Sequence, residues 1–207
     1  MTARTSRVLW ITIGVFSILI SLYPAIYLTA DWSKIGLTAS KGSLIHDFWW
    51  KTAFYAHIIG GAITLIAGWL QFSSKIRKNK PKLHRAIGIV YVIIVCLFGA
   101  TSGLYLAYYA NGGFLNSMGF GLLAVLWLFT TVMALRTARA KKYNMHKNWM
   151  IRSYALNYAA VTLRLWLPLL TFVLDYNHVL AYAIVAWICW VPNLIFSEIV
   201  IVKKWVI

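Results

Sequence analysis

Acidic residues are scarce in this 207-residue chain, which contains four Asp and Glu against twenty Lys and Arg. Charged residues make up only 12% of the sequence, whereas a soluble domain carries about 25%. Two cysteines are too few for a secreted disulfide scaffold, and four prolines and thirteen glycines are too few for a collagen-like chain. The low charge and the 61% apolar content also exclude intrinsic disorder.

Motifs of soluble enzymes are missing as well. The sequence contains no phosphate-binding glycine loop, no His-Glu-x-x-His, no Gly-x-Ser-x-Gly and no Cys-x-x-Cys. With five histidines and four acidic residues, the chain has few candidates for the acid, base or metal ligands of a hydrolytic site. No catalytic residue is therefore assigned from the sequence, and the sequence does not decide whether the protein is an enzyme.

Long apolar runs dominate what is present. The mean hydropathy of +0.73 and the eleven tryptophans are typical of a membrane-embedded protein. Six segments are long enough to cross about 30 Å of hydrocarbon, near residues 8–28, 52–73, 87–109, 116–136, 149–173 and 179–202. We predict an all-α polytopic fold, with residues 1–207 forming a single integral membrane domain of six transmembrane helices. The first run exceeds the apolar core of a signal peptide, so we expect a retained span.

Basic residues lie mostly on one side of this predicted bundle. They occupy the N-terminal tail, the second and fourth connections and the C-terminal end, whereas the other side holds Lys34, Lys41 and Lys51. The positive-inside rule then places both termini in the cytoplasm and the chain in the cytoplasmic (inner) membrane. This asymmetry explains the net charge of +16 without nucleic acid. The predicted partners are the lipid bilayer and anionic lipid headgroups.

Ionisable and polar residues inside apolar runs mark candidate sites, because they are expensive to place in lipid. His57, Ser102, Tyr105 and Arg164 lie at similar heights in the outer third of the predicted membrane, as does Tyr23. The planar fork of arginine suits a carboxylate or a phosphate. We predict that the first four form a pocket for a small amphiphilic or anionic ligand. In the alternative interpretation, Arg164 pairs with an acid of an outer loop, and His57 only forms a hydrogen bond between two helices.

A second polar layer is predicted at the cytoplasmic boundary. Arg152 and Glu198 can form a structural ion pair, which would explain the only acid inside a span. His84 and His146 lie at matched depth just before two inner helix starts, so they are candidate ligands of one b-type haem or of a metal. In the alternative, these histidines contact headgroups or cap helices. No second histidine pair shares a depth, so two haems are not expected.

Several short motifs resemble those of a known family. They are His57-x-x-Gly60-Gly61, Gly68-Trp-Leu-Gln71-Phe72, His84-Arg85-Ala-Ile-Gly88-x-x-Tyr91, Ser102-Gly103-Leu-Tyr105, His146-x-x-Trp149-Met150-Ile-Arg152-Ser153-Tyr154 and Thr162-Leu-Arg164-Leu-Trp-Leu-Pro168. Over roughly residues 50–170 they resemble a prokaryotic family of predicted membrane proteins of unknown function (domain of unknown function 2306). The resemblance implies a multi-pass bacterial membrane protein and brings no established activity, cofactor or substrate.

Three functions fit the sequence. The leading interpretation is a binding protein that holds an amphiphilic or anionic molecule in the outer-third pocket. The second is a redox protein that carries one b-type haem or handles quinone, and the third is an accessory subunit of a larger membrane complex. Alternating-access transport is poorly supported, because the spans are interrupted only near Pro168 and Pro192. Cys96 and Cys189 lie in apolar runs and are expected to be free thiols.

Overall fold

The computed structural model describes residues 3–32 and 35–205 of the chain. Throughout this described part the regular elements are helices, as the apolar runs predict. Six helical segments are long and apolar enough to cross a membrane: Arg7–Thr29, Phe48–Gln71, Pro81–Tyr108, Phe114–Arg139, Tyr143–Val173 and His178–Val202. The all-α fold and the six predicted segments are therefore confirmed.

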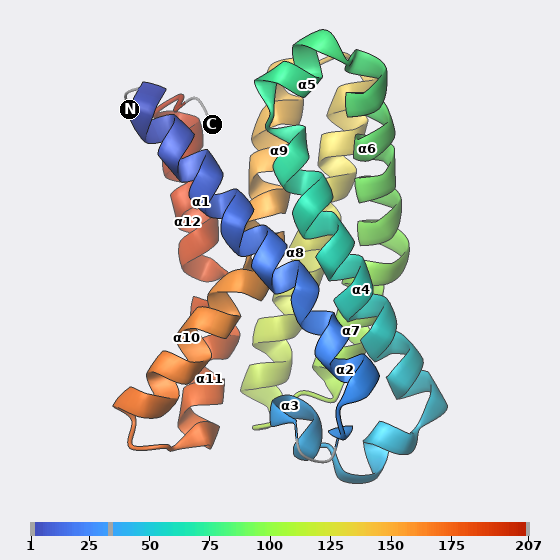
Figure 1. The fold of residues 1–207 in the computed structure, drawn as a ribbon, viewed down its shortest axis with the longest axis vertical. Coiled ribbons are helices and arrows are strands. Elements are labelled where there is room, and N and C mark those ends of the chain that lie inside the picture. Colours follow the sequence, from blue (N-terminus) through green and yellow to red (C-terminus); the bar gives the residue numbers. More distant parts are fainter. Residues whose placement is uncertain (1–2, 33–34, 206–207) are drawn as a thin grey trace.

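The first span changes geometry near its far end. Helix α1 (Ala3–Leu22) is followed by the 3₁₀ turn Tyr23–Ala25 and by the short helix α2 (Ile26–Thr29). Pro24 is the second residue of the 3₁₀ turn, and because it lacks an N–H group it cannot continue the hydrogen bonding of α1. Figure 1 shows α1 crossing the other helices diagonally and passing over α4. The next connection contains α3 (Gly36–Ala39) and a 3₁₀ turn at Gly42–His46.

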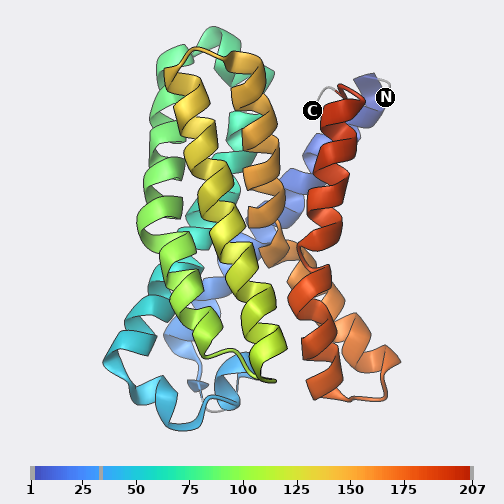
Figure 2. The same cartoon turned by 180° about the vertical axis from the view of Figure 1, so that it is seen from behind.

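The middle of the chain forms a bundle in which four long helical segments lie side by side (Figures 1 and 2). Its elements are α4 (Phe48–Gln71), α5 (Ser74–Asn79), α6 (Pro81–Ile94), a π-helical turn (Val95–Gly99), α7 (Ala100–Tyr108), α8 (Phe114–Arg139) and α9 (Tyr143–Asn157). The turn between α7 and α8 contains Gly112 and Gly113 at φ of +84° and +83°, in the left-handed region that glycine adopts without strain. The π-helical turn was not predicted from the sequence.

The last two spans are each broken near their middle. The fifth consists of α9 and α10 (Ala159–Val173), and the sixth of α11 (His178–Ile188) and α12 (Val191–Val202). The predicted interruption near Pro192 is present, because α12 begins one residue before this proline. The prediction of an interruption near Pro168 is wrong. Helix α10 continues through this proline, and the fifth span is interrupted at Tyr158 instead.

Polar side chains link the two interrupted spans at their breaks. The Asn193 amide donates to the carbonyl of Cys189 (2.9 Å) and to the hydroxyl of Thr162 (3.0 Å), and this hydroxyl donates in turn to the Cys189 carbonyl. The amide also reaches the carbonyl of Ala155 on α9 (3.3 Å). The carbonyls of Cys189 and Ala155, which lie beside the breaks, therefore find partners inside the protein.

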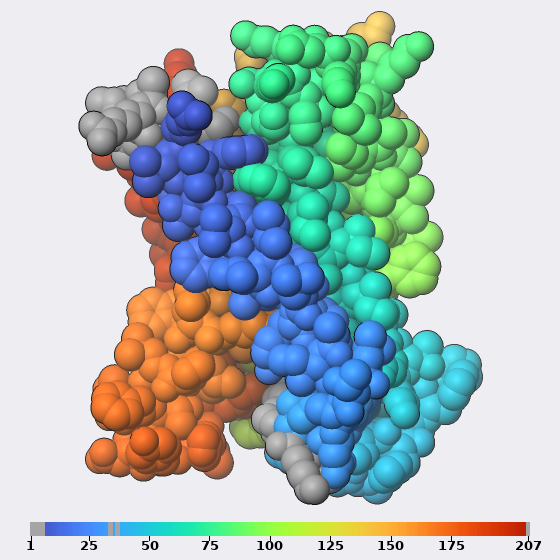
Figure 3. All heavy atoms as spheres, viewed as in Figure 1, coloured from blue at the N-terminus to red at the C-terminus, as the bar shows by residue number. Residues whose placement is uncertain are grey.

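Both ends of the described chain lie at the same end of the molecule as α5 and the α8–α9 connection (Figures 1 and 2). We call this the basic end, because it carries the lysines and arginines of the tail, the second and fourth connections and the last turn of the chain. The opposite end holds α3 and the turns after α7 and α10. The hairpin of α10 and α11 diverges from the bundle towards this opposite end, and Figure 3 shows the surface notched between the hairpin and the lower part of the first span.

Several helices extend beyond the predicted apolar runs at the basic end. The third span begins at Pro81 rather than near residue 87, and the fifth begins at Tyr143 rather than near residue 149. These added turns carry lysine and asparagine, which are tolerated in a helix but lower the hydropathy of a sequence window. As a result His84 and His146, which we placed just before helix starts, are each the fourth residue of a helix.

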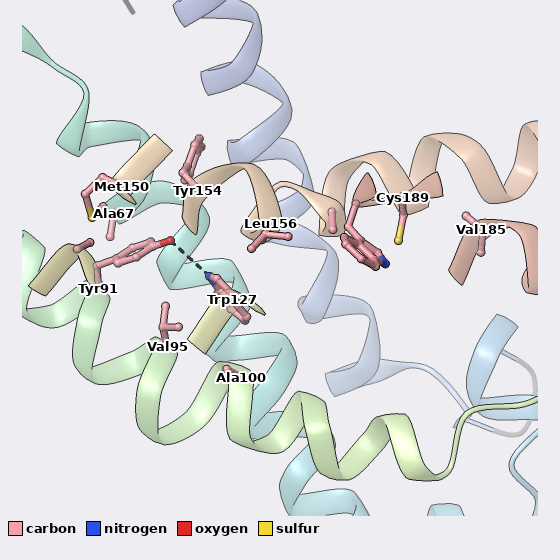
Figure 4. Packing of buried hydrophobic residues seen from close by; sticks show 13 residues of the cluster. Ala67, Tyr91, Val95, Ala100, Trp127, Met150, Tyr154, Leu156, Val185 and Cys189 are labelled. Carbon is pink, nitrogen blue, oxygen red and sulfur yellow. Dashed lines mark hydrogen bonds between the residues drawn. The ribbon is translucent and has the colours of Figure 1, made fainter. Parts of the chain in front are cut away.

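The core of the bundle combines aromatic packing with buried hydroxyl groups (Figure 4). The Ser153 hydroxyl is hydrogen-bonded to the hydroxyls of Tyr91 (2.8 Å) and Thr131 (2.7 Å), which joins α9 to α6 and α8. Tyr154 packs so closely on Gly68 of α4 that a Cβ atom there would lie 2.4 Å from its ring. These contacts hold α9 firmly in the bundle.

Candidate functional site

Arg164 lies on α10, five residues beyond the start of that helix, and faces the first span. Its Nη1 donates to the carbonyl of Ala160 (2.7 Å), and its Cζ lies 4.5 Å from the ring centroid of Tyr23. Its Nε is buried and has no hydrogen-bond partner among the described residues. Arg164 forms no ion pair within this part of the chain. Within the described residues, the guanidinium therefore contacts one carbonyl and one aromatic ring.

The break at Tyr158 brings Arg164 to this position. Because α9 ends at Asn157, α10 leaves the bundle, and Arg164 on α10 contacts Tyr23 of the first span. Tyr27, one turn further along the first span, is buried against Phe54 and lies within electrostatic range of Arg164. The site is therefore shared by the first and fifth spans.

His57 of α4 lies close to the same site and is held by the π-helical turn of the third span. Its Nδ1 is 2.9 Å from the carbonyl of Gly99, and the ring lies within electrostatic range of Arg164. Since a carbonyl only accepts, Nδ1 carries the proton, and in the neutral ring Nε2 is an unprotonated acceptor. Nε2 has no hydrogen-bond partner among the described residues. A Cβ atom at Gly103 would lie 2.9 Å from the ring, so this glycine makes room for it.

Ser102 meets His57 through one shared acceptor. Its buried hydroxyl donates to the carbonyls of Phe98 and Gly99, the latter at 3.3 Å. Tyr105, one turn further along α7, is 36% exposed and its ring packs 5.2 Å from that of Tyr109. His57 and Ser102 thus meet at the π-helical turn, and Arg164 interacts with His57 only electrostatically, whereas Tyr105 contacts a different neighbour.

Two features of this site were missed in the sequence. The contact with Tyr23 was not predicted, although its height was, because depth along a helix does not say which way a side chain points. The carbonyl of Gly99 was missed entirely. The run of small residues 99–103 is the signal that could have indicated it, because such runs let a neighbouring helix approach closely.

The basic end holds the one ion pair seen inside the spans of the described chain. Arg152 of α9 binds Glu198 of α12 through two bonds, Nε to Oε1 at 2.6 Å and Nη2 to Oε2 at 2.8 Å. The Arg152 guanidinium also lies over the ring of Trp149, 4.6 Å from its centroid. This fork geometry is the strongest form of an arginine–carboxylate contact, and it ties the fifth span to the sixth.

His84 and His146 are neighbours at the same end of the bundle. The Nδ1 of His146 lies 2.9 Å from the carbonyl of Ala134, and since a carbonyl only accepts, this nitrogen donates. The Nδ1 of His84 is buried without a hydrogen-bond partner in the described chain. The two rings interact electrostatically with each other, and His84 also interacts with Arg77. No group of three or more metal-ligating side chains occurs among the described residues, so a metal here would have two protein ligands at most.

Two cavities on the described surface lie away from Arg164. One, of about 390 Å³, lies between α9 and the end of α12 and is lined by Asn144, Lys147, Asn148, Ile151, Val200, Ile201, Lys204 and Trp205. The other is an apolar groove between α4 and α6, lined by Ile63, Ile66, Ala67, Leu70, Ala86, Ile87 and Val90. Both thiols are free: Cys189 is buried at the break in the sixth span, and Cys96 is partly buried.

Comparison with known proteins assigns a family and no activity. A family model described as "Predicted membrane protein (DUF2306)" matches residues 54–201, from α4 to α12. No curated protein and no solved structure shows a significant match. The matched region includes His57, His84, Arg152 and Arg164, whereas Tyr23 lies before it. The chain belongs to the DUF2306 family of predicted membrane proteins, whose function is unknown.

Proposed function

We propose that this chain binds a small anionic amphiphile, such as a long-chain carboxylate, at Arg164 in the outer third of the membrane. The observation that carries the proposal is the buried Arg164 Nε, which has no hydrogen-bond partner and no ion pair among the described residues. A guanidinium at membrane depth costs about 2.5–3.5 kcal/mol on insertion scales, and an anion held by its planar fork would offset that cost.

His57 supplies the second recognition element. Its Nδ1 is engaged by the carbonyl of Gly99, so Nε2 can accept a hydrogen bond from a hydroxyl or a protonated acid group of the ligand. Arg164 lies over the ring of Tyr23 and donates from Nη1 to the carbonyl of Ala160, so Nε is the donor that remains for the anion. Large apolar side chains on α10 that are exposed to the surroundings, such as Leu165 and Leu169, would accompany the tail of an amphiphile.

Oleate is a suitable probe, with oleyl alcohol as its uncharged counterpart. Purified protein in detergent should bind oleate, and Arg164→Leu should abolish this binding while the protein stays monodisperse. Arg139→Leu, which removes an exposed arginine at the basic end, is the matched control and should bind as the unaltered chain does. Equal binding of oleyl alcohol, or unchanged binding by Arg164→Leu, would refute the proposal.

A second candidate is a single b-type haem at His84 and His146. The buried Nδ1 of His84, which lacks a partner in the described chain, and its electrostatic interaction with His146 favour it. Oxidised and reduced absorption spectra of protein purified with added haem test this candidate. A Soret band that disappears in His84→Ala/His146→Ala and persists in His178→Ala supports it, and absence of the band refutes it. The quinone and accessory-subunit alternatives rest on the sequence alone.

We infer further that the basic end faces the cytoplasm, in the inner membrane of a bacterium. The support is the concentration of lysine and arginine at that end. Ser43 and Lys142 are exposed at opposite ends of the molecule, so a cysteine placed at each should react with an impermeant maleimide from opposite sides of intact cells. Labelling of both from one side would refute this orientation.

A further inference from the structure

A second binding site is built into the basic end, between α9 and the last turn of the chain. One face of α9 presents Asn144, Lys147, Asn148 and Ile151, which occupy positions i, i+3, i+4 and i+7 of the helix and therefore lie on the same side. Together with the end of α12 they line the cavity of about 390 Å³. A cavity of this size is within the range of small-molecule sites, about 300–1,000 Å³.

The opposite wall is formed by a fixed turn at the end of α12. Lys204 has a φ of +50°, and the chain reverses so that the Trp205 N–H donates to the carbonyl of Val200 at 3.0 Å. Trp205 packs edge-on against Phe196, with 6.2 Å between ring centroids. This arrangement closes the helix and sets an indole ring at the rim of the cavity. Tryptophan is the residue that proteins favour at the level of lipid headgroups.

The chemistry of the lining is divided between its floor and its mouth. Ile151 and Val200 are buried at the floor, whereas Lys147 and Lys204 are exposed at the mouth with two asparagines beside them. No acid lines the cavity, and Glu198, the acid nearest in sequence, is occupied by Arg152. The cavity therefore offers positive charge and amide groups above an apolar base.

We propose that this cavity binds the headgroup of an anionic phospholipid, with its phosphate at Lys147 and Lys204 and its acyl chain along Ile151 and Val200. The charge of the two lysines, the absence of an acid from the lining and the apolar floor all favour a ligand that is both anionic and hydrophobic. This site lies at the opposite end of the fifth span from Arg164, so it does not depend on the function proposed there.

Native mass spectrometry of the detergent-purified chain, titrated with phosphatidylglycerol or phosphatidylcholine, tests the proposal. Each lysine near an anionic surface strengthens association about fivefold, so two should favour the anionic lipid on the order of 30-fold. In Lys147→Gln/Lys204→Gln this preference should fall towards one. Lys75→Gln/Lys78→Gln removes the same charge from exposed positions of α5 at the same end, and it should leave most of the preference intact.

Three outcomes would overturn the proposal. The first is an unchanged preference in Lys147→Gln/Lys204→Gln. The second is an equal loss in the α5 control, which would show general attraction to the basic end rather than a site. The third is equally tight binding of glycerol 3-phosphate, which would identify a soluble phosphorylated ligand. Thermal unfolding of each variant shows whether it is folded, and Trp205→Ala, which removes a wall without changing charge, provides a second test through weaker binding of phosphatidylglycerol.

Discussion

Two arginines of the fifth span, in opposite halves of the protein, differ in the groups that contact their charged side chains. Arg152, on α9 at the basic end, has a carboxylate at 2.6 Å and an aromatic ring beneath it. Arg164, on α10 in the opposite half, also has an aromatic ring, but a single carbonyl takes the place of the acid. The first arrangement is complete within the protein, whereas the second leaves a donor free. This difference supports the structural role predicted for Arg152 and the binding role proposed for Arg164.

A lysine in the connection beyond the first span extends the comparison. Lys41 is buried, and its ammonium donates to the carbonyl of Tyr109 and to the side-chain oxygen of Asn111 (2.8 Å). Burial lowers the pKa of Lys41 below its usual value. In the half of the molecule opposite the basic end, the cations Lys41 and Arg164 thus donate hydrogen bonds to uncharged oxygens. An anion added there would gain most, because it would meet cations that have no carboxylate partner among the described residues.

The largest expected effect on stability is at Arg152. Glu198→Gln leaves the guanidinium without its carboxylate, and we expect the free energy of unfolding to fall by about 1–2 kcal/mol, a figure reduced because both side chains are partly exposed. Thermal unfolding in detergent measures the loss. The double variant Arg152→Leu/Glu198→Leu should recover most of it, because neither charge is then left alone. An unaltered midpoint in Glu198→Gln would show that the pair contributes nothing.

The next effect concerns the hydroxyl groups that hold α9. Ser153→Ala removes the shared partner of Tyr91 and Thr131, and we expect a loss of about 1 kcal/mol, typical of a hydrogen bond between helices in a membrane. The same unfolding assay applies. Ser43→Ala, at an exposed position in the connection before α4, is the control and should change little. Equal midpoints for the two variants would contradict the role given to this hydroxyl.

The third effect is a dependence of stability on pH at Lys41. Its pKa in the folded chain lies below the unfolded value of 10.5, so between these two values the unfolded chain binds more protons. The free energy of unfolding should therefore rise with pH across that window. Comparing unfolding midpoints of the unaltered chain and of Lys41→Met over this range isolates the contribution. If the free energy of unfolding of Lys41→Met rose with pH just as steeply, another group would be responsible for the pH dependence.

The smallest effect on stability, and the sharpest contrast with Arg152, is expected at Arg164. In the absence of ligand Arg164→Leu should preserve or slightly raise the free energy of unfolding, because it removes a charge that lacks an ion pair in the described chain and keeps the apolar bulk. A loss as large as that of Glu198→Gln would mean that Arg164 is structural, and the comparison would fail.

Depth along a helix could be predicted from the sequence, because it needs only a count of residues and a fixed rise per residue. That count placed His57, Ser102 and Arg164 at one height, and it set Arg152 near Glu198. Direction could not be predicted in the same way. Tyr105 shares the height of Ser102, but its ring faces Tyr109, and the contact between Arg164 and Tyr23 depends on the break between α9 and α10.

The sequence by itself determined the number of spans, the helical fold and the basic end, because hydropathy and charge act locally and along the chain. The interruption near Pro192 could be predicted from its proline, whereas only the tertiary structure decided the other irregularities of the helices. The π-helical turn at Val95–Gly99 and the end of α9 at Asn157 have no proline to indicate them. They exist because neighbouring helices supply partners for the backbone, such as His57 for the Gly99 carbonyl. Such partners come from distant parts of the chain, and no local pattern specifies them.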